Sequence, residues 1–123
     1  MDIAFSDLDL RASNPGWFTL CAEFTCVFDG QVIRVPIGFK TDLASIPRPL
    51  RGLFDRTGLS LKPAIVHDYL YTDGSIPTLP RKLCDKVFYA CLRAVGVSAW
   101  TAWVYYAGVR MGGGWSFKTR IPV

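Results

Sequence analysis

The dipeptide Asp29-Gly30 constrains the fold more than any other feature of this chain, because it lies between two runs of strand-forming residues. The run at 17–28 is rich in aromatic residues, Thr and Val, and the run at 31–36 alternates in hydropathy. A two-residue Asp-Gly loop favours a type I′ turn, in which both central residues need a positive φ. The sequence therefore predicts a β-hairpin over about residues 17–37.

Two other segments carry turn signals instead of a periodic pattern. Residues 1–16 end in the turn sequence SNPG and are predicted to be irregular. Residues 38–49 begin with a glycine, end with two closely spaced prolines and contain small polar side chains that bond to nearby backbone. We therefore expect a polar loop after the hairpin.

Three helices are predicted after this loop. Pro63 suits the first position of a helix at 63–71, where its missing N–H costs nothing. The apolar residues of 81–95 recur with the 3.6-residue period of an amphipathic helix. Ser98 can cap a third helix, Ala99–Met111, which is apolar nearly all round and is expected to be buried or to form an interface. The predicted fold class is α+β, with an N-terminal antiparallel β-hairpin or small sheet, a polar loop and about three helices.

Length and composition describe one globular domain of 123 residues, with 50% hydrophobic and 20% charged residues. The formal charge is +4, but Lys and Arg are scattered, so no specific nucleic-acid partner is expected. The longest apolar run, Val95–Val109, is interrupted by polar residues and is shorter than the ~20 residues that span a bilayer, so the chain is not expected to be transmembrane. The start MDIAFSDLDL lacks a basic region, so no secretory signal peptide is expected.

The four cysteines, at 21, 26, 84 and 91, form no CxxC pair, and the chain has one histidine, so the spacings of zinc modules are absent. Cys21 and Cys26 would point to opposite faces of one strand and could not easily pair with each other. Buried free thiols are therefore expected in preference to disulfides, which fits synthesis in a reducing compartment.

The candidate chemistry concentrates around His67, the only histidine, which is followed directly by Asp68. In a helix, His67 and Tyr71 lie one turn apart on one face, and Asp68 points about 100° away. An antiparallel second helix would bring Asp85 to His67. Asp85 would then orient one ring nitrogen and leave the other as a base that activates water. The alternative is that His67 and Asp68 are satisfied polar groups beside the core.

The motif HDYLY, followed by the aspartate of CDKVFYACL, resembles the His-Asp-x-x-Tyr and Asp core of the phospholipase A2 superfamily. The resemblance implies that His67 is the base, that Asp85 orients it and that the Tyr71 hydroxyl bonds to Asp85. It also implies a Ca²⁺ cofactor, with Asp68 as a ligand. The glycine-rich calcium loop and the disulfides of the secreted enzymes have no counterpart in this sequence.

Asp42 is the candidate for a second metal ligand, because it lies in the polar loop that leads towards the His67 helix. We hypothesise that Asp42, His67, Asp68 and Asp85 converge on one site. Asp42 would then supply calcium with an oxygen ligand in place of the missing glycine-rich loop. The alternative is an aspartate that forms an Asx-turn or caps a helix.

The segments GFKTDLASIPRPLR, AIVHDYLY and VRMGG, with an Arg81…Asp85 pair, are together similar to a phage and prophage family of unknown function. Members of that family often occur near tail genes. The resemblance implies a bacteriophage origin, synthesis in the host cytoplasm and a place in the virion, with other tail subunits as partners.

The two resemblances together suggest a virion protein of the phage tail with a phospholipase A2-like, metal-assisted ester hydrolase site, acting on host membrane lipid during envelope passage. One alternative is a non-enzymatic structural or assembly component of the tail, in which the His-Asp cluster is structural. A weaker alternative is a peptidoglycan or peptide hydrolase.

Two groups of side chains allow more than one interpretation. The first group could form a membrane-interface belt, or could belong to the core or a subunit interface. It consists of Trp100, Trp103, Tyr105 and Tyr106. The second group could meet phosphate groups, or could be a solvated loop edge. It consists of Arg48, Arg51 and Arg56.

Overall fold

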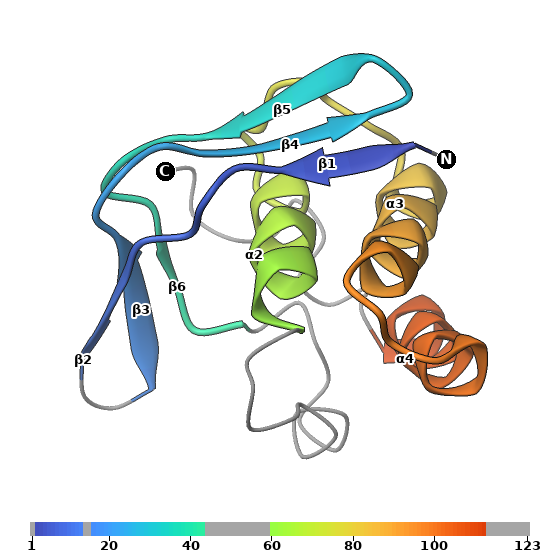
Figure 1. The fold of residues 1–123 in the computed structure, drawn as a ribbon. Helices are drawn as coiled ribbons and strands as arrows, with labels where there is room; N and C mark the ends of the chain where they lie inside the picture. Colours follow the sequence, from blue (N-terminus) through green and yellow to red (C-terminus); the bar gives the residue numbers. More distant parts are fainter. Residues whose placement is uncertain (1, 14–15, 44–59, 113–123) are drawn as a thin grey trace.

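The structure, a computed structural model, describes residues 2–13, 16–43 and 60–112 (Figure 1). Within these residues the fold is α+β, as predicted: short antiparallel strands form two small sheets, and helices follow them. The strands are β1 (Ile3–Phe5), β2 (Leu10–Ser13), β3 (Trp17–Leu20), β4 (Phe24–Phe28), β5 (Gln31–Val35) and β6 (Lys40–Thr41). The helices are α2 (Leu61–Leu70), α3 (Arg81–Ala94) and α4 (Ala99–Gly112).

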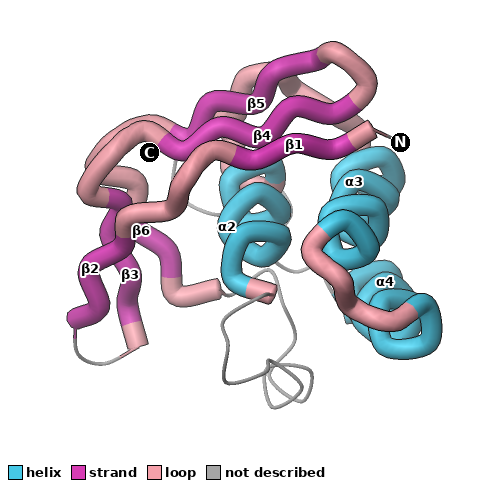
Figure 2. Tube along the Cα trace, in the orientation of Figure 1, coloured by secondary structure: helices cyan, strands magenta, loops and turns pink. Residues whose placement is uncertain are grey.

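The sheet with strand order β1-β4-β5 is built on the predicted hairpin. Asp29 and Gly30 have φ angles of 48° and 81°, so both turn residues adopt the positive φ of a type I′ turn. Alternate residues of β4 are buried, beginning with Phe24, and β5 buries Ile33 and Val35. The sheet lies across α2 and α3 (Figures 1 and 2), so its buried side chains form one wall of the core.

The prediction of a single strand over 17–28 is wrong, because the chain bends at 21–23 and divides between two sheets. β3 pairs with β2 and β6 in the second sheet, whereas β4 pairs with β1 and β5. The prediction that residues 1–16 are irregular is also wrong, because β1 and β2 form there. Ile3 lies opposite Phe28. Because the pairing partner is so distant in sequence, no local sequence pattern predicts β1.

The helices begin and end within two residues of the predicted limits. α2 and α3 run antiparallel and pack together, and α4 packs on α3 (Figure 1). Ser98 caps α4 as predicted, since its Oγ accepts a hydrogen bond of 3.3 Å from the Thr101 N–H. α4 buries only one stripe of side chains, Ala102, Tyr105 and Val109. No helix within the described residues is both long and apolar enough to cross a membrane.

All four cysteines are free thiols. Cys26, Cys84 and Cys91 are buried, as predicted, but Cys21 is exposed because it lies in the bend between β3 and β4. The Sγ atoms of Cys26 and Cys91 are 3.8 Å apart and join β4 to α3.

Part of the predicted polar loop lies outside the described residues, and so do Arg48, Arg51 and Arg56.

Candidate functional site

His67 lies at the contact between α2 and α3, with its side chain fully buried. Its Nε2 is 2.6 Å from Oδ1 of Asp85 on α3. The imidazole ring also contacts two aromatic rings, with its centroid 4.2 Å from that of Tyr71 and 4.7 Å from that of Phe88. The antiparallel helix pair therefore holds the imidazole in one orientation, in surroundings that are largely free of water.

Asp85 is the polar centre of the site. Its Oδ1 also accepts a hydrogen bond of 2.5 Å from the Tyr71 hydroxyl, and its Oδ2 accepts one of 2.9 Å from Nη1 of Arg110 on α4. Burial acts to raise the pKa of the Asp85 carboxyl, but the hydrogen bond and charge of His67, together with the hydrogen bonds of Tyr71 and Arg110, outweigh it and lower the pKa. Asp85 is therefore a buried carboxylate that stays ionised.

Tyr71 is a buried hydroxyl that keeps its proton. Burial, together with the neighbouring Asp85 carboxylate, raises its pKa well above the ordinary value for tyrosine. Nε of Arg81 also donates to the Tyr71 oxygen, at 3.3 Å. Nη2 of Arg81 donates to the backbone oxygens of Val109 and Arg110, at 2.8 and 2.7 Å. The end of α4 is thus bonded to the start of α3 beside the site.

Arg110 was not among the residues predicted for the site. Its approach to Asp85 depends on how α4 packs against α3, which no local pattern reports. The one available signal was its place in the segment VRMGG, which the phage resemblance includes. Phe88 is a second residue that the prediction missed, since its position on the apolar stripe of α3 predicts only core packing.

Asp68 is also fully buried, but its carboxylate takes part in a different contact from that of Asp85. Its Oδ2 accepts a hydrogen bond from the Thr41 hydroxyl, and Thr41 Oγ1 accepts one of 2.9 Å from the Leu43 N–H. Asp42 is half-buried and lies in the chain between Thr41, the end of β6, and Leu43. The structure therefore connects the polar loop to α2 through Thr41, one of the small polar side chains predicted to bond to nearby backbone, as it does at the Leu43 N–H.

The predicted calcium ligands are Asp42 and Asp68. No group of three or more His, Cys, Asp or Glu side chains in this part of the chain could hold a metal ion. Calcium takes six to eight oxygen ligands. The involvement of Asp42 and Asp68 in metal binding therefore stays a prediction.

Comparison with protein families matches residues 18–109 to the model described as "Protein of unknown function (DUF1353)". The chain belongs to this family. No curated protein and no solved structure matches it. The match confirms the prediction of a family of unknown function, while the phage origin and the phospholipase A2 resemblance stay predictions. The matched range contains His67, Tyr71 and Asp85 of this DUF1353 chain, and ends one residue before Arg110.

The chemistry that His67 could carry out in this DUF1353 chain follows from the hydrogen bond of its imidazole to Asp85. When Nε2 carries the proton and donates to Asp85, the lone pair of neutral His67 is on Nδ1. An ionised carboxylate on the far side of the ring stabilises the imidazolium that forms when Nδ1 takes a proton. On its Asp85 side, the imidazole is therefore arranged as general-base catalysis at Nδ1 requires.

Proposed function

We propose that this protein is a hydrolase in which His67 activates a water molecule for attack on an ester, as in the phospholipase A2 pattern. The observation that supports the proposal most is the contact of 2.6 Å between His67 Nε2 and Asp85 Oδ1, with Tyr71 bonded to the same oxygen. These contacts join the three residues to which the pattern assigns the roles of base, orienter and supporting hydroxyl.

The proposed reaction uses only the residues of this chain and water. Nδ1 of His67 takes a proton from water as the water oxygen attacks the ester carbonyl carbon. Asp85 stabilises the resulting imidazolium, and Tyr71 with Arg110 keeps the Asp85 carboxylate in place. As the tetrahedral intermediate collapses, the carbon–oxygen bond to the alcohol breaks, and the imidazolium returns the proton to the leaving alkoxide.

We place this activity in the bacteriophage tail, acting on phospholipid of the host membrane during envelope passage. The support is the resemblance of GFKTDLASIPRPLR and AIVHDYLY to a phage and prophage family often encoded near tail genes. The protein would then be made in the host cytoplasm and carried in the virion, with other tail subunits as partners. Calcium, held by Asp68 and Asp42, is a separate part of the proposal.

A second candidate function is a non-enzymatic structural or assembly component of the tail. The observation that favours it is the complete burial of both His67 and Asp85 side chains. In that case the cluster serves to join α2, α3 and α4. A third candidate is hydrolysis of peptidoglycan or of a peptide bond, with His67 as the same base.

The deciding experiment measures hydrolysis of a short-chain phospholipid, a peptidoglycan fragment and a peptide by the wild type and by His67→Ala. Loss of the base is expected to lower kcat for phospholipid at least about 100-fold. Asp73→Ala is the matched control, because Asp73 is an exposed carboxylate outside the cluster and its loss is expected to leave kcat unchanged. Repeating the wild-type assay with a chelator, and again with added calcium, tests the metal.

The outcomes separate the candidates. Equal rates for the wild type and a folded His67→Ala variant would exclude His67 as the base. No hydrolysis of any substrate by the wild type, together with a lower free energy of unfolding for His67→Ala, would support the structural candidate instead.

A further inference from the structure

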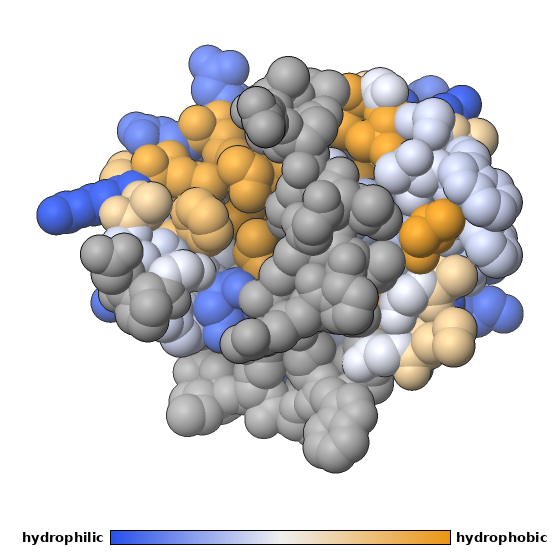
Figure 3. Space-filling view, turned by 90° about the horizontal axis from the view of Figure 1, so that it is seen from below, coloured by the Kyte–Doolittle hydropathy of each residue, from blue (hydrophilic) through white to orange (hydrophobic). Residues whose placement is uncertain are grey.

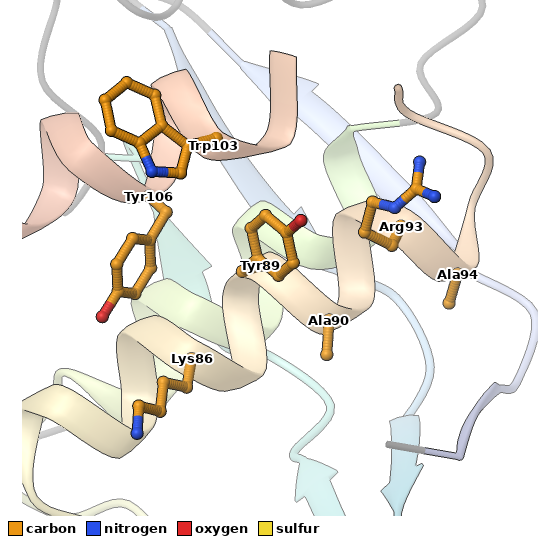
Figure 4. Close-up of a pocket in the computed structure, with 7 residues that line it drawn as sticks. All are labelled: Lys86, Tyr89, Ala90, Arg93, Ala94, Trp103 and Tyr106. Carbon is orange, nitrogen blue, oxygen red and sulfur yellow. The ribbon is translucent and has the colours of Figure 1, made fainter. Parts of the chain in front are cut away.

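A groove runs between α3 and α4 on the side of α3 that faces away from the His67 cluster. Its volume is about 650 Å³, within the range of ligand-binding clefts. The side chains of Tyr89, Trp103 and Tyr106 form its aromatic walls, and Ala90 and Ala94 leave room between them (Figure 4). No part of the proposed catalytic machinery lines this groove.

The groove is flanked by positive charge, and the two helices that form it carry no exposed acidic residue. It is lined by Lys86 and Arg93, which lie seven residues, and therefore about 10 Å, apart along α3. Lys82, one turn before Lys86, is exposed as well. From Arg81 to the end of α4 the only acidic residue is Asp85, which is fully buried and bonded. An anionic partner would therefore meet no opposing carboxylate from these two helices.

Exposed indole rings continue the groove along α4. Trp100 is 73% exposed and Trp103 is 54% exposed, and their rings stack with centroids 5.8 Å apart. Tyr105, the third member of the predicted aromatic stripe, is instead buried in the core. Seen from below, the described surface on the α4 side of the molecule is mixed in hydropathy, with pale, tan and orange patches and blue at its margin (Figure 3).

We propose that the outer face of the α3–α4 pair docks on an anionic phospholipid bilayer. Indole rings settle at the level of lipid headgroups, where one part of the ring is apolar and another is wet. Lys82, Lys86 and Arg93 would face the phosphates of anionic lipids. Single-stranded nucleic acid fits less well, because Trp100 and Trp103 stack on each other and so offer fewer free ring faces to bases.

This docking face deepens the proposed function, because it supplies a way to hold the protein on the membrane that contains its substrate. Naming that lipid as the substrate rests on the proposed function. Binding itself needs no hydrolysis, and it involves side chains of α3 and α4 that the catalytic cluster does not use.

The test measures partition of the purified chain onto vesicles of equal parts phosphatidylglycerol and phosphatidylcholine, against vesicles of phosphatidylcholine alone. Lys86→Gln with Arg93→Gln is expected to weaken partition about 30-fold, since each basic side chain near an anionic surface contributes about fivefold. Arg11→Gln with Lys40→Gln is the charge-matched control. Both of its residues are exposed on the second sheet, and their loss is expected to change partition less than about twofold.

The indole rings are tested separately. Trp100→Ser with Trp103→Ser is expected to weaken partition at least about tenfold, because two exposed rings no longer leave water on binding. The blue shift of tryptophan fluorescence on adding anionic vesicles is expected to disappear in the same variant. Ile37→Ser, which removes an exposed apolar side chain elsewhere, is expected to bind as the wild type does.

Three results would overturn the proposal. One is equal partition onto both kinds of vesicle, or partition that survives both double variants. Another is tight binding to an oligothymidylate without binding to vesicles. The last is a wild-type chain that does not bind vesicles but self-associates in sedimentation experiments. In that case, Trp100→Ser with Trp103→Ser would abolish the self-association.

Failure of this proposal is distinguishable from failure of the proposed function. Hydrolysis of a short-chain phospholipid dispersed as single molecules depends on His67 and needs no docking face. A chain that cleaves the dispersed lipid but does not bind vesicles would overturn the docking face alone. A chain that binds anionic vesicles without cleaving any lipid would overturn the hydrolase proposal alone.

Discussion

Asp85 shows how one buried carboxylate is kept ionised by three donors from two other helices. His67 comes from α2, Tyr71 directly follows the end of α2, and Arg110 comes from α4. Removing a carboxylate from water costs several kcal/mol, and its partners offset this only when all are in place. The ionised Asp85 carboxylate is therefore stabilised only when α2, α3 and α4 are packed together.

Replacing Asp85 with Ala is expected to lower the free energy of unfolding by about 3–5 kcal/mol, because buried polar partners lose their carboxylate. Urea denaturation at neutral pH measures the loss. Asp73→Ala, which removes an exposed carboxylate, is expected to change stability by less than about 0.5 kcal/mol. A loss below about 1 kcal/mol for Asp85→Ala would contradict a role for the carboxylate in stability.

The same carboxylate predicts a pH dependence of stability. The pKa of Asp85 is lowered in the folded protein. Its contribution is fully present above the unfolded value of about 3.9, and it is lost as the pH falls through the lower, folded value. Stability of the wild type is therefore expected to fall on acidification below about pH 4, and Asp85→Asn is expected to remove part of this fall. The free energy of unfolding is measured by urea denaturation at several pH values below about 7. An identical decrease on acidification in the two proteins would show that Asp85 does not cause this pH dependence.

Arg81 shows how two elements are joined at their ends. It lies in the first turn of α3, and its guanidinium donates to the oxygens of Val109 and Arg110 in the last turn of α4. The last carbonyls of a helix lack partners within the helix, and a cation there also interacts favourably with the helix dipole. Arg81 thereby caps α4 from another element and holds Arg110 beside Asp85.

Arg81→Met is expected to lower the free energy of unfolding by about 1.5–3 kcal/mol, because hydrogen bonds from a charged group are lost. Amide hydrogen exchange is expected to accelerate in the last turn of α4 more than in α2. Lys82→Met is the control, since Lys82 is the exposed neighbour of Arg81. Unchanged exchange in the last turn of α4 would show that Arg81 does not cap it.

At the scale of the whole molecule, two sheets with separate strand orders share one set of helices. The sheet β1-β4-β5 lies across α2 and α3 (Figure 1), and the sheet β2-β3-β6 reaches α2 through the hydrogen bond from Thr41 to Asp68. Thr41 is fully buried, as is Asp68. This bond therefore connects the second sheet to the helical part of the molecule.

Thr41→Val is expected to lower the free energy of unfolding by about 1–3 kcal/mol, because the buried Asp68 carboxylate loses a donor while the volume hardly changes. Thr25→Val, at a half-buried position in β4, is the control and is expected to change stability much less. The measurement is again urea denaturation. Equal effects of the two substitutions would contradict the role of Thr41 as a connection between the sheet and α2.

Several features could be predicted because their causes are local. The Asp29-Gly30 turn follows from the backbone freedom of its two residues, and both adopt positive φ. The one-turn spacing of His67 and Tyr71 follows from helix geometry alone, and the short antiparallel return brings both to Asp85. Ser98 caps α4 through a hydrogen bond from the Thr101 N–H, which is only three residues away.

What the sequence by itself determined was thus the α+β class, the hairpin turn, the limits of the helices and the residues of the α2–α3 cluster. Only the tertiary structure decided the pairing of β1 and β2, the division of 17–28 between two sheets, and the contacts of Arg110 and Thr41. The physical reason is the range of the interactions. Turn angles, caps and helix spacing act over a few residues, whereas strand pairing and donors to buried carboxylates join segments that meet only when the chain has folded.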